Sequence, residues 1–253
     1  MPSRQLSPLE LNHLRKHGFS DLDPDSLGKK PVEYFTGHAE FLGLDFLVTP
    51  DTLIPRLESE YLVQQAVQII ADQKISHPVI ADIGTGSGCL GLSLAFNLAQ
   101  RQIPYTIFLS DISPQALKVA EQNAAKLLTS TANLFFETSD LLKSFPSIKF
   151  DLLLANLPYI PTKNLSRLDP SVRDYEPRLA LAGGTDGTFY INRLLKDLPP
   201  FLFRGGVAIF EIDDTHSLTS FTLPSSLSAQ IDKDVHGVPR YLTVRLKTSS
   251  LLD

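Results

Sequence analysis

From residue 77 onward, the chain alternates short apolar runs with longer segments of helical spacing. The predicted strands lie at residues 78–84, 105–111, 133–140, 150–156, 206–212 and 240–246. The predicted helices lie at residues 89–99, 113–128 and 188–198. Such alternation is typical of a parallel sheet with helices on both faces, and the last run alternates as a half-exposed strand does. We therefore predict an α/β fold, a doubly wound sheet whose last strand is antiparallel.

Shorter features precede this region. Residues 6–15 have the spacing of one short amphipathic helix, with Ser7 as its N-cap. Residues 38–49 predict a β-hairpin, and residues 58–71 predict a helix. We expect three parts: a reduced N-terminal helical segment at 1–30, a hairpin with its connecting helix at 31–76, and the main domain at 77–253.

The cysteine count, the apolar runs and the net charge limit the classes of protein to which this chain can belong. The only thiol is Cys89, which excludes an intramolecular disulfide and a cysteine-based zinc site. We find no signal peptide and no run of about eighteen apolar residues, so we expect a cytoplasmic protein with no membrane partner. The net charge of -5 argues against a broad basic face for nucleic acid.

The histidines show no ligand spacing, so we predict surface positions for them and no metal site. These residues are His13, His17, His38, His77, His216 and His236.

A glycine loop, D-I-G-T-G-S-G, follows the first strand of the sheet and opens into a helix. Its glycines allow a sharp turn, and the helix N-terminus offers backbone N–H groups and partial positive charge to a ligand. The loop residues are Gly84, Thr85, Gly86, Ser87 and Gly88. Asp111 ends the next strand at the same edge and can accept hydrogen bonds from ribose hydroxyls, so we predict a nucleoside site.

The run D-L-L-L-A-N-L-P-Y-I-P begins as a strand that is apolar on both faces, as a central parallel strand must be. Pro158 ends that strand because it has no N–H for the sheet ladder. Asn156 is therefore presented at the carboxyl end of a core strand.

The close spacing G-x-G-x-G, with Asp82 just before it, resembles the first motif of S-adenosylmethionine-dependent methyltransferases. The resemblance implies a seven-stranded Rossmann-like sheet and S-adenosyl-L-methionine as the cofactor. It also implies that Asp140, at the end of the third strand, lies near the adenine.

N-L-P-Y, residues 156–159, resembles motif four of the amino-methyltransferases, which is Asn or Asp, Pro, Pro, Tyr. The resemblance implies catalysis on a nitrogen whose lone pair is delocalised. Such a nitrogen must be held in line with the methyl group by acceptors for its N–H groups. We expect the acceptors to be the Asn156 side-chain oxygen and the Leu157 carbonyl, with Tyr159 packing over the planar group beside Pro158.

N-L-P-Y also resembles the ribosomal RNA adenine dimethyltransferases, but the flanking sequence distinguishes the two families. P-V-E-Y-F-T-G-H-A-E-F-L-G-L-D-F, D-T-L-I-P-R-L-E-S-E and V-R-D-Y-E-P-R-L-A-L-A-G-G-T-D-G resemble the PrmC/HemK family of protein N5-glutamine methyltransferases. The resemblance covers about residues 31–246. It implies that the substrate is the glutamine of the Gly-Gly-Gln loop in class I peptide chain release factors. Carried over, the cofactor-binding residues are Gly84, Thr85, Gly86, Ser87, Gly88, Asp111, Asp140, Leu141 and Asn156.

The chain departs from the family pattern at several places. Leu57 and Leu157 stand where proline is usual, Leu141 where an aromatic residue is frequent, and Asp213 where glycine is usual. The N-terminus has room for about one or two helices, fewer than the family's helical domain.

Other functions remain open at this stage. One alternative is N6-adenine methylation of RNA or DNA, and another is a non-catalytic S-adenosylmethionine-binding module. We expect a monomer that meets nucleic acid only through a ribosome-associated substrate. Arg56 and Glu58 are either a solvated pair or a group near the cofactor carboxylate, and we expect Glu176 to brace the loop after motif four.

Overall fold

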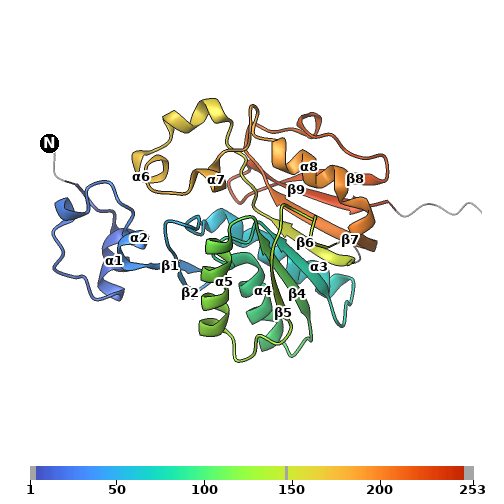
Figure 1. The fold of residues 1–253 in the computed structure, drawn as a ribbon, viewed down its shortest axis with the longest axis horizontal. Coiled ribbons are helices and arrows are strands. Elements are labelled where there is room, and N and C mark those ends of the chain that lie inside the picture. Colours follow the sequence, from blue (N-terminus) through green and yellow to red (C-terminus); the bar gives the residue numbers. More distant parts are fainter. Residues whose placement is uncertain (1–3, 146–147, 248–253) are drawn as a thin grey trace, which may run out of the picture.

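The core of the protein is a seven-stranded sheet with the strand order β5-β4-β3-β6-β7-β9-β8 (Figure 1). The computed structural model describes residues 4–145 and 148–247. The strands are β3 (Val79–Ile83), β4 (Thr106–Asp111), β5 (Leu134–Thr138), β6 (Phe150–Ala155), β7 (Leu202–Glu211), β8 (Leu227–Lys233) and β9 (Pro239–Leu246). In this sheet β9 runs antiparallel to both of its neighbours, β7 and β8, whereas the pairs formed among β3 to β7 are parallel. The predicted doubly wound sheet with an antiparallel last strand is confirmed.

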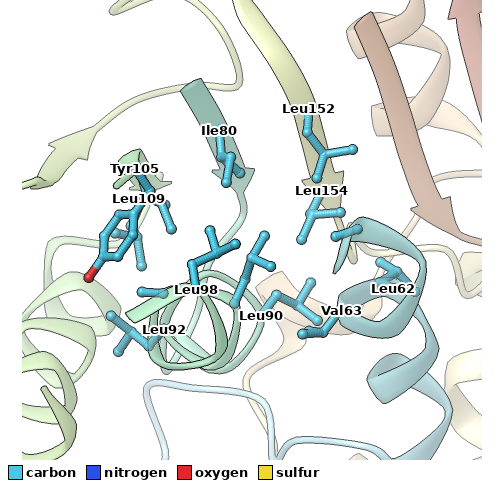
Figure 2. Close-up of a cluster of buried hydrophobic side chains, with 14 of the residues drawn as sticks. Leu62, Val63, Ile80, Leu90, Leu92, Leu98, Tyr105, Leu109, Leu152 and Leu154 are labelled. Atoms are coloured by element: carbon cyan, nitrogen blue, oxygen red, sulfur yellow. The ribbon is translucent and has the colours of Figure 1, made fainter. Parts of the chain in front are cut away.

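The helices cover both faces of the sheet. Residues of α3 (Glu60–Asp72), α4 (Cys89–Gln100) and α5 (Pro114–Leu127) share one buried cluster with β3 and β6. Figure 2 shows Leu62 of α3 and Leu90 of α4 in that cluster with Ile80, Leu152 and Leu154. On the other face, α8 (Phe189–Asp197) packs against the alternate residues of the same strands.

Strand β6 shows why the apolar run of the sequence is continuous. Leu152 and Leu154 lie in the cluster under α3 and α4, whereas Leu153 and Ala155 lie in the cluster under α8. Each of these four residues is fully buried. A central parallel strand with helices on both sides has no face left for polar residues.

Strand β8 was not predicted from the sequence. Its alternate residues Leu227, Ala229 and Ile231 pack on the core, while the residues between them are polar. It pairs only with β9 at the edge of the sheet. A short edge strand needs just one apolar face, so its hydrophobic pattern is weak.

The N-terminal elements match the predictions in part. Helix α1 (Pro8–Lys16) begins at the N-cap Ser7, whose hydroxyl accepts a hydrogen bond from the Glu10 backbone N–H. The hairpin is β1 (His38–Phe41) and β2 (Leu44–Leu47). Helix α2 (Val32–Thr36) was missed because it is five residues long. The division of the chain into three parts stays a prediction.

Several short elements complete the fold. They are α6 (Pro170–Arg173), α7 (Arg178–Leu181) and 3-10 turns at Pro24–Leu27, Leu57–Ser59, Thr162–Arg167, Pro199–Phe201 and Leu218–Ser220. Within residues 4–145 and 148–247, no helix has the length and apolar character that crossing a membrane requires.

Asn123 of α5 ties the hairpin to the main sheet. Its side-chain oxygen accepts a hydrogen bond from Leu47 N–H at 2.7 Å. Its amide group donates to the carbonyl oxygens of Leu47, at 3.0 Å, and Ser87, at 2.8 Å. The side chain is fully buried, so its removal deprives the Leu47 and Ser87 backbone groups of these protein partners.

Replacing Asn123 with alanine should therefore lower the free energy of unfolding by roughly 2 to 4 kcal/mol, because buried backbone groups lose their partners. Urea denaturation measures this loss. The matched control is Asn133→Ala, at an exposed position. Equal effects of the two substitutions would contradict the structural role of Asn123.

Candidate active site

A cavity of about 330 Å³ opens at the carboxyl ends of the parallel strands. The loop after β3 contributes the residues from Gly84 to Ser87 to its wall, and β4 contributes Asp111. Other wall residues follow β5 and β6: Ser139, Asp140, Leu141, Asn156, Leu157 and Pro158. The structure thus brings together the predicted site residues except Gly88 and Tyr159. In a doubly wound sheet this edge is where ligands bind.

The glycine loop is held by backbone hydrogen bonds to β4. The N–H groups of Gly84 and Thr85 both donate to the Ser110 carbonyl oxygen, at 2.8 and 2.9 Å. Gly86 has φ +56°, and a Cβ atom there would meet nothing within 4 Å, so the loop leaves open space at this point. Gly88 has φ +85° and packs against Leu92 of α4, which explains why it lies off the cavity wall.

Asp111 supports the loop from the end of β4. Its carboxylate oxygens accept hydrogen bonds from the Gly86 and Ser113 N–H groups, each at 2.9 Å. Burial raises the pKa of Asp111. A carboxylate has about four acceptor positions. Asp111 therefore keeps acceptor capacity for a ligand's hydroxyl groups.

Asp82 lies beneath the loop and is fully buried. Its Oδ2 accepts hydrogen bonds from Thr85 Oγ1 at 2.6 Å and from Gly91 N–H at 2.8 Å. Burial raises the pKa of Asp82 to about 6. Asp82 thus anchors the loop to α4 from below.

Asn156 has its amide orientation set by two neighbours. Its Nδ2 donates to Ser59 Oγ at 2.8 Å and to Glu211 Oε2 at 3.1 Å. A carboxylate only accepts hydrogen bonds, so the amide nitrogen faces Glu211 and the amide oxygen faces away from it. Within the described part of the chain, this Oδ1 accepts no hydrogen bond, and neither does the carbonyl oxygen of Leu157.

Glu211 itself ends β7 and has 1% of its surface exposed. It also accepts hydrogen bonds from Ser59 Oγ at 2.5 Å and from the Tyr159 hydroxyl at 2.8 Å. Burial raises the pKa of Glu211. The sequence analysis did not predict a role for Ser59 or Glu211. Ser59 lies in the segment D-T-L-I-P-R-L-E-S-E after the hairpin, and Glu211 is the last residue of β7.

Tyr159 is not among the wall residues of the cavity. Its hydroxyl is bound to Glu211, and its ring packs against the cluster under α8. Tyr190 of α8 lies on the cavity wall. That Tyr159 packs over a planar substrate group stays a prediction.

Asp140 is engaged by two cations. Its Oδ2 accepts hydrogen bonds from Arg193 at 2.8 Å and Lys143 at 2.6 Å. The Arg193 bond, followed by the Lys143 bond, lowers the pKa of Asp140 to about 2. Leu141 beside it has φ +58°, an uncommon conformation for a residue with a side chain.

Arg56 pairs with Glu176 and not with Glu58. Glu176 is buried and also accepts a hydrogen bond from Ile54 N–H at 3.3 Å. Glu176 belongs to the segment that follows motif four, and these two bonds tie that segment to the one after the hairpin. The bracing predicted for Glu176 thus runs between these two segments, and Arg56 of the second lies on the cavity wall.

Cys89 begins α4, is half-buried against the cluster under that helix and lies on the cavity wall. Desolvation raises the pKa of its thiol to about 12. His216 was predicted on the surface but is 7% exposed. It packs between Phe221 and the turn at Gly187, and its Nε2 lies 3.1 Å from the Asp186 carbonyl oxygen.

Asp82 makes the stability of the fold depend on pH. Its pKa is raised from 3.8 to about 6, so the folded protein holds the proton more tightly than the unfolded chain. Stability from this group is present at pH 4 and is lost as pH rises through 6. The unfolding free energy of Asp82→Asn relative to wild type should therefore rise by roughly 2 kcal/mol between pH 4 and pH 7.

Urea denaturation at several pH values measures this difference. Asp21→Asn, at an exposed position, is the control and should run parallel to the wild type. A constant difference between Asp82→Asn and wild type would contradict the prediction.

Comparison with known structures supports the fold. The chain superimposes on the catalytic domain of hMettl16 with a TM-score of 0.62 at 12% identity, over 83% of this chain and 77% of that one. For a methyltransferase from Pyrococcus furiosus the TM-score is 0.53 at 15% identity, over 82% and 90% of the two chains. At these identities the likeness concerns the fold alone.

Comparison of sequences identifies the family. Residues 76–195 match the family model of a methyltransferase domain. A release factor glutamine methyltransferase from Koribacter versatilis is 36% identical over 226 residues, which are 87% of this chain and 76% of that protein. One from Moorella thermoacetica is 44% identical over 72% of this chain and 62% of that protein. One from Chlorobaculum tepidum is 34% identical over 93% and 81%. The chain belongs to the release factor glutamine methyltransferase family.

Proposed function

We propose that this protein transfers a methyl group from S-adenosyl-L-methionine to the side-chain amide nitrogen of the glutamine in the Gly-Gly-Gln loop of class I release factors. The observation that carries the proposal is the orientation of Asn156. Its amide nitrogen is bound to Ser59 and Glu211, while its oxygen is left without a partner among the described residues. This oxygen belongs to a wall residue of the same cavity as the glycine loop.

The cavity suits a nucleoside cofactor. The opening at Gly86 allows close approach of a ligand to the backbone, and Asp111 has acceptor capacity for ribose hydroxyls. Asp140 and Leu141 stand on the part of the wall that follows β5. Bound here, S-adenosylmethionine supplies an electrophilic methyl group. The loop residues and Asp111 hold the cofactor, and no metal ion is needed for this chemistry.

The substrate amide needs hydrogen-bond acceptors for its N–H groups. Its lone pair is delocalised into the carbonyl group, so the nitrogen is a weak nucleophile and must be oriented. The Asn156 Oδ1 and Leu157 carbonyl oxygens accept hydrogen bonds from its N–H groups and fix its plane. Because these acceptors are preorganised, little reorganisation is required during the reaction.

A direct test is the intact mass of a release factor before and after incubation with this protein and S-adenosylmethionine. We expect the addition of one methyl group at the loop glutamine. Asn156→Ala should lower the rate about 100- to 1,000-fold, as loss of one preorganised hydrogen-bond partner does in other enzymes. Asn133→Ala is the matched control and should leave the rate unchanged.

The same reaction separates the alternatives if it is run with labelled cofactor. Label on RNA or DNA, abolished by Asn156→Ala, would favour adenine methylation. Cofactor binding without transfer to any of these substrates would favour a binding module. Absence of methyl transfer to the glutamine while cofactor is bound overturns the proposal.

Glu211 should act as a positioning residue for Asn156. Glu211→Gln removes the negative charge and replaces one of the two acceptor oxygens by an amide donor, which weakens the hold on the Asn156 nitrogen. We expect kcat of Glu211→Gln to fall by more than about tenfold, with unchanged affinity for the cofactor. Steady-state kinetics and calorimetry measure the two effects.

The pH profile distinguishes positioning from a general structural role. In wild type, protonation of Glu211 at low pH removes an acceptor, and its raised pKa brings this loss nearer to neutral pH. The fall of kcat at low pH that comes from protonation of Glu211 should be absent in Glu211→Gln. The control is Glu58→Gln, because Glu58 is exposed nearby. An unchanged kcat in Glu211→Gln would contradict the assignment.

A further inference from the structure

Three side chains that are distant from the cavity's catalytic wall meet beside the hairpin. His17 follows α1, His38 begins β1, and Asp45 lies on β2. One nitrogen or oxygen atom of each lies within 4.8 Å of those of the other two. His38 Nδ1 is 3.0 Å from both carboxylate oxygens of Asp45, and the His17 and His38 ring centroids are 4.6 Å apart.

We propose that His17, His38 and Asp45 bind one divalent transition-metal ion of the zinc class. Two imidazole nitrogens and one carboxylate oxygen are a ligand set that zinc uses in proteins, with water in the remaining position. The separation of 3.0 Å between His38 Nδ1 and the Asp45 oxygens is compatible with two ligands bound about 2 Å from one ion.

The position of His17 in this cluster is not explained by an ion pair. Asp45 already pairs with His38 and with Lys126, whose Nζ is 2.7 Å from Oδ2. His13 is also engaged, since its Nε2 lies 2.8 Å from Thr36 Oγ1. Among the described residues, by contrast, no hydrogen bond involves a ring nitrogen of His17. Its ring is half-buried and contacts the rings of both His13 and His38, with centroids 4.6 Å apart in each pair.

The position of the cluster gives the ion a structural role. The N-terminal segment has a small apolar cluster of its own, centred on Leu14, Leu27 and Val32. A small core stabilises a segment weakly, and metal ions are one means by which proteins compensate for this. An ion between His17 and the hairpin fastens α1 to the part of the chain that Asn123 holds to the sheet.

Replacing Lys126 distinguishes a metal site from a network of ion pairs. Its ammonium group competes with a cation for Asp45 and repels it. Replacing Lys126 with methionine should therefore tighten zinc binding. If the cluster were only an ion-pair network, the substitution would remove a stabilising contact and produce no gain in metal affinity.

The experiment is a titration of the full chain, stripped of metal by a chelator, with Zn²⁺ followed by calorimetry and with Co²⁺ followed by visible absorption. We expect one ion per chain. His17→Gln, His38→Gln and Asp45→Asn should each weaken binding at least about tenfold. The control is His236→Gln, an exposed histidine in the loop between β8 and β9, which should bind as wild type does.

A second measurement uses the unmodified chain, so it does not depend on the variants folding. Zn²⁺ should shift the imidazole NMR signals of His17 and His38 and leave those of His77 and His236 in place. The thermal midpoint should rise with Zn²⁺ in wild type and not in His17→Gln. Zinc binding that persists unchanged in His17→Gln and His38→Gln, or no shift of their signals, overturns the proposal.

Discussion

The candidate site depends on a single buried acceptor, the Glu211 carboxylate at the end of β7. It receives hydrogen bonds from Ser59, Asn156 and Tyr159, which come from segments far apart in the sequence. A carboxylate without partners at this depth would be strongly destabilising, so the three donors and the acceptor require one another. The geometry of the Asn156 amide follows from this requirement, because its nitrogen must turn toward the charge.

Two further carboxylates, Asp82 and Asp111, organise the glycine-loop side of the cavity. Asp82 holds the glycine loop from below through Thr85 and Gly91, and Asp111 holds it from the side through Gly86. The loop therefore keeps its open conformation through bonds made by the protein itself. Rigid support of this kind reduces the entropy that is lost when a ligand binds, because the loop is already ordered.

Sequence periodicity was enough to predict most of the sheet, because a strand such as β6 is apolar on both faces and a helix such as α5 has a buried face and a polar face. It was insufficient for β8, whose polar face at the sheet edge weakens the pattern. The site residues at strand ends were predicted from the order of the strands. Contacts between residues far apart in the sequence could not be predicted. Examples are Ser59 with Glu211, 152 residues apart, and His17 with His38 and Asp45. The Tyr159 hydroxyl turns toward the buried Glu211 carboxylate, a contact between residues 52 positions apart that the sequence did not reveal.

The leucine at position 157 has a consequence for which residue can stand at position 84. Its side chain is buried, and a Cβ atom built on Gly84 would lie 3.0 Å from its Cδ2. Gly84 also has φ +74°, a conformation that residues with a side chain rarely adopt. A larger residue at position 84 would therefore strain the turn after β3 and press against the turn after β6, which carries Asn156.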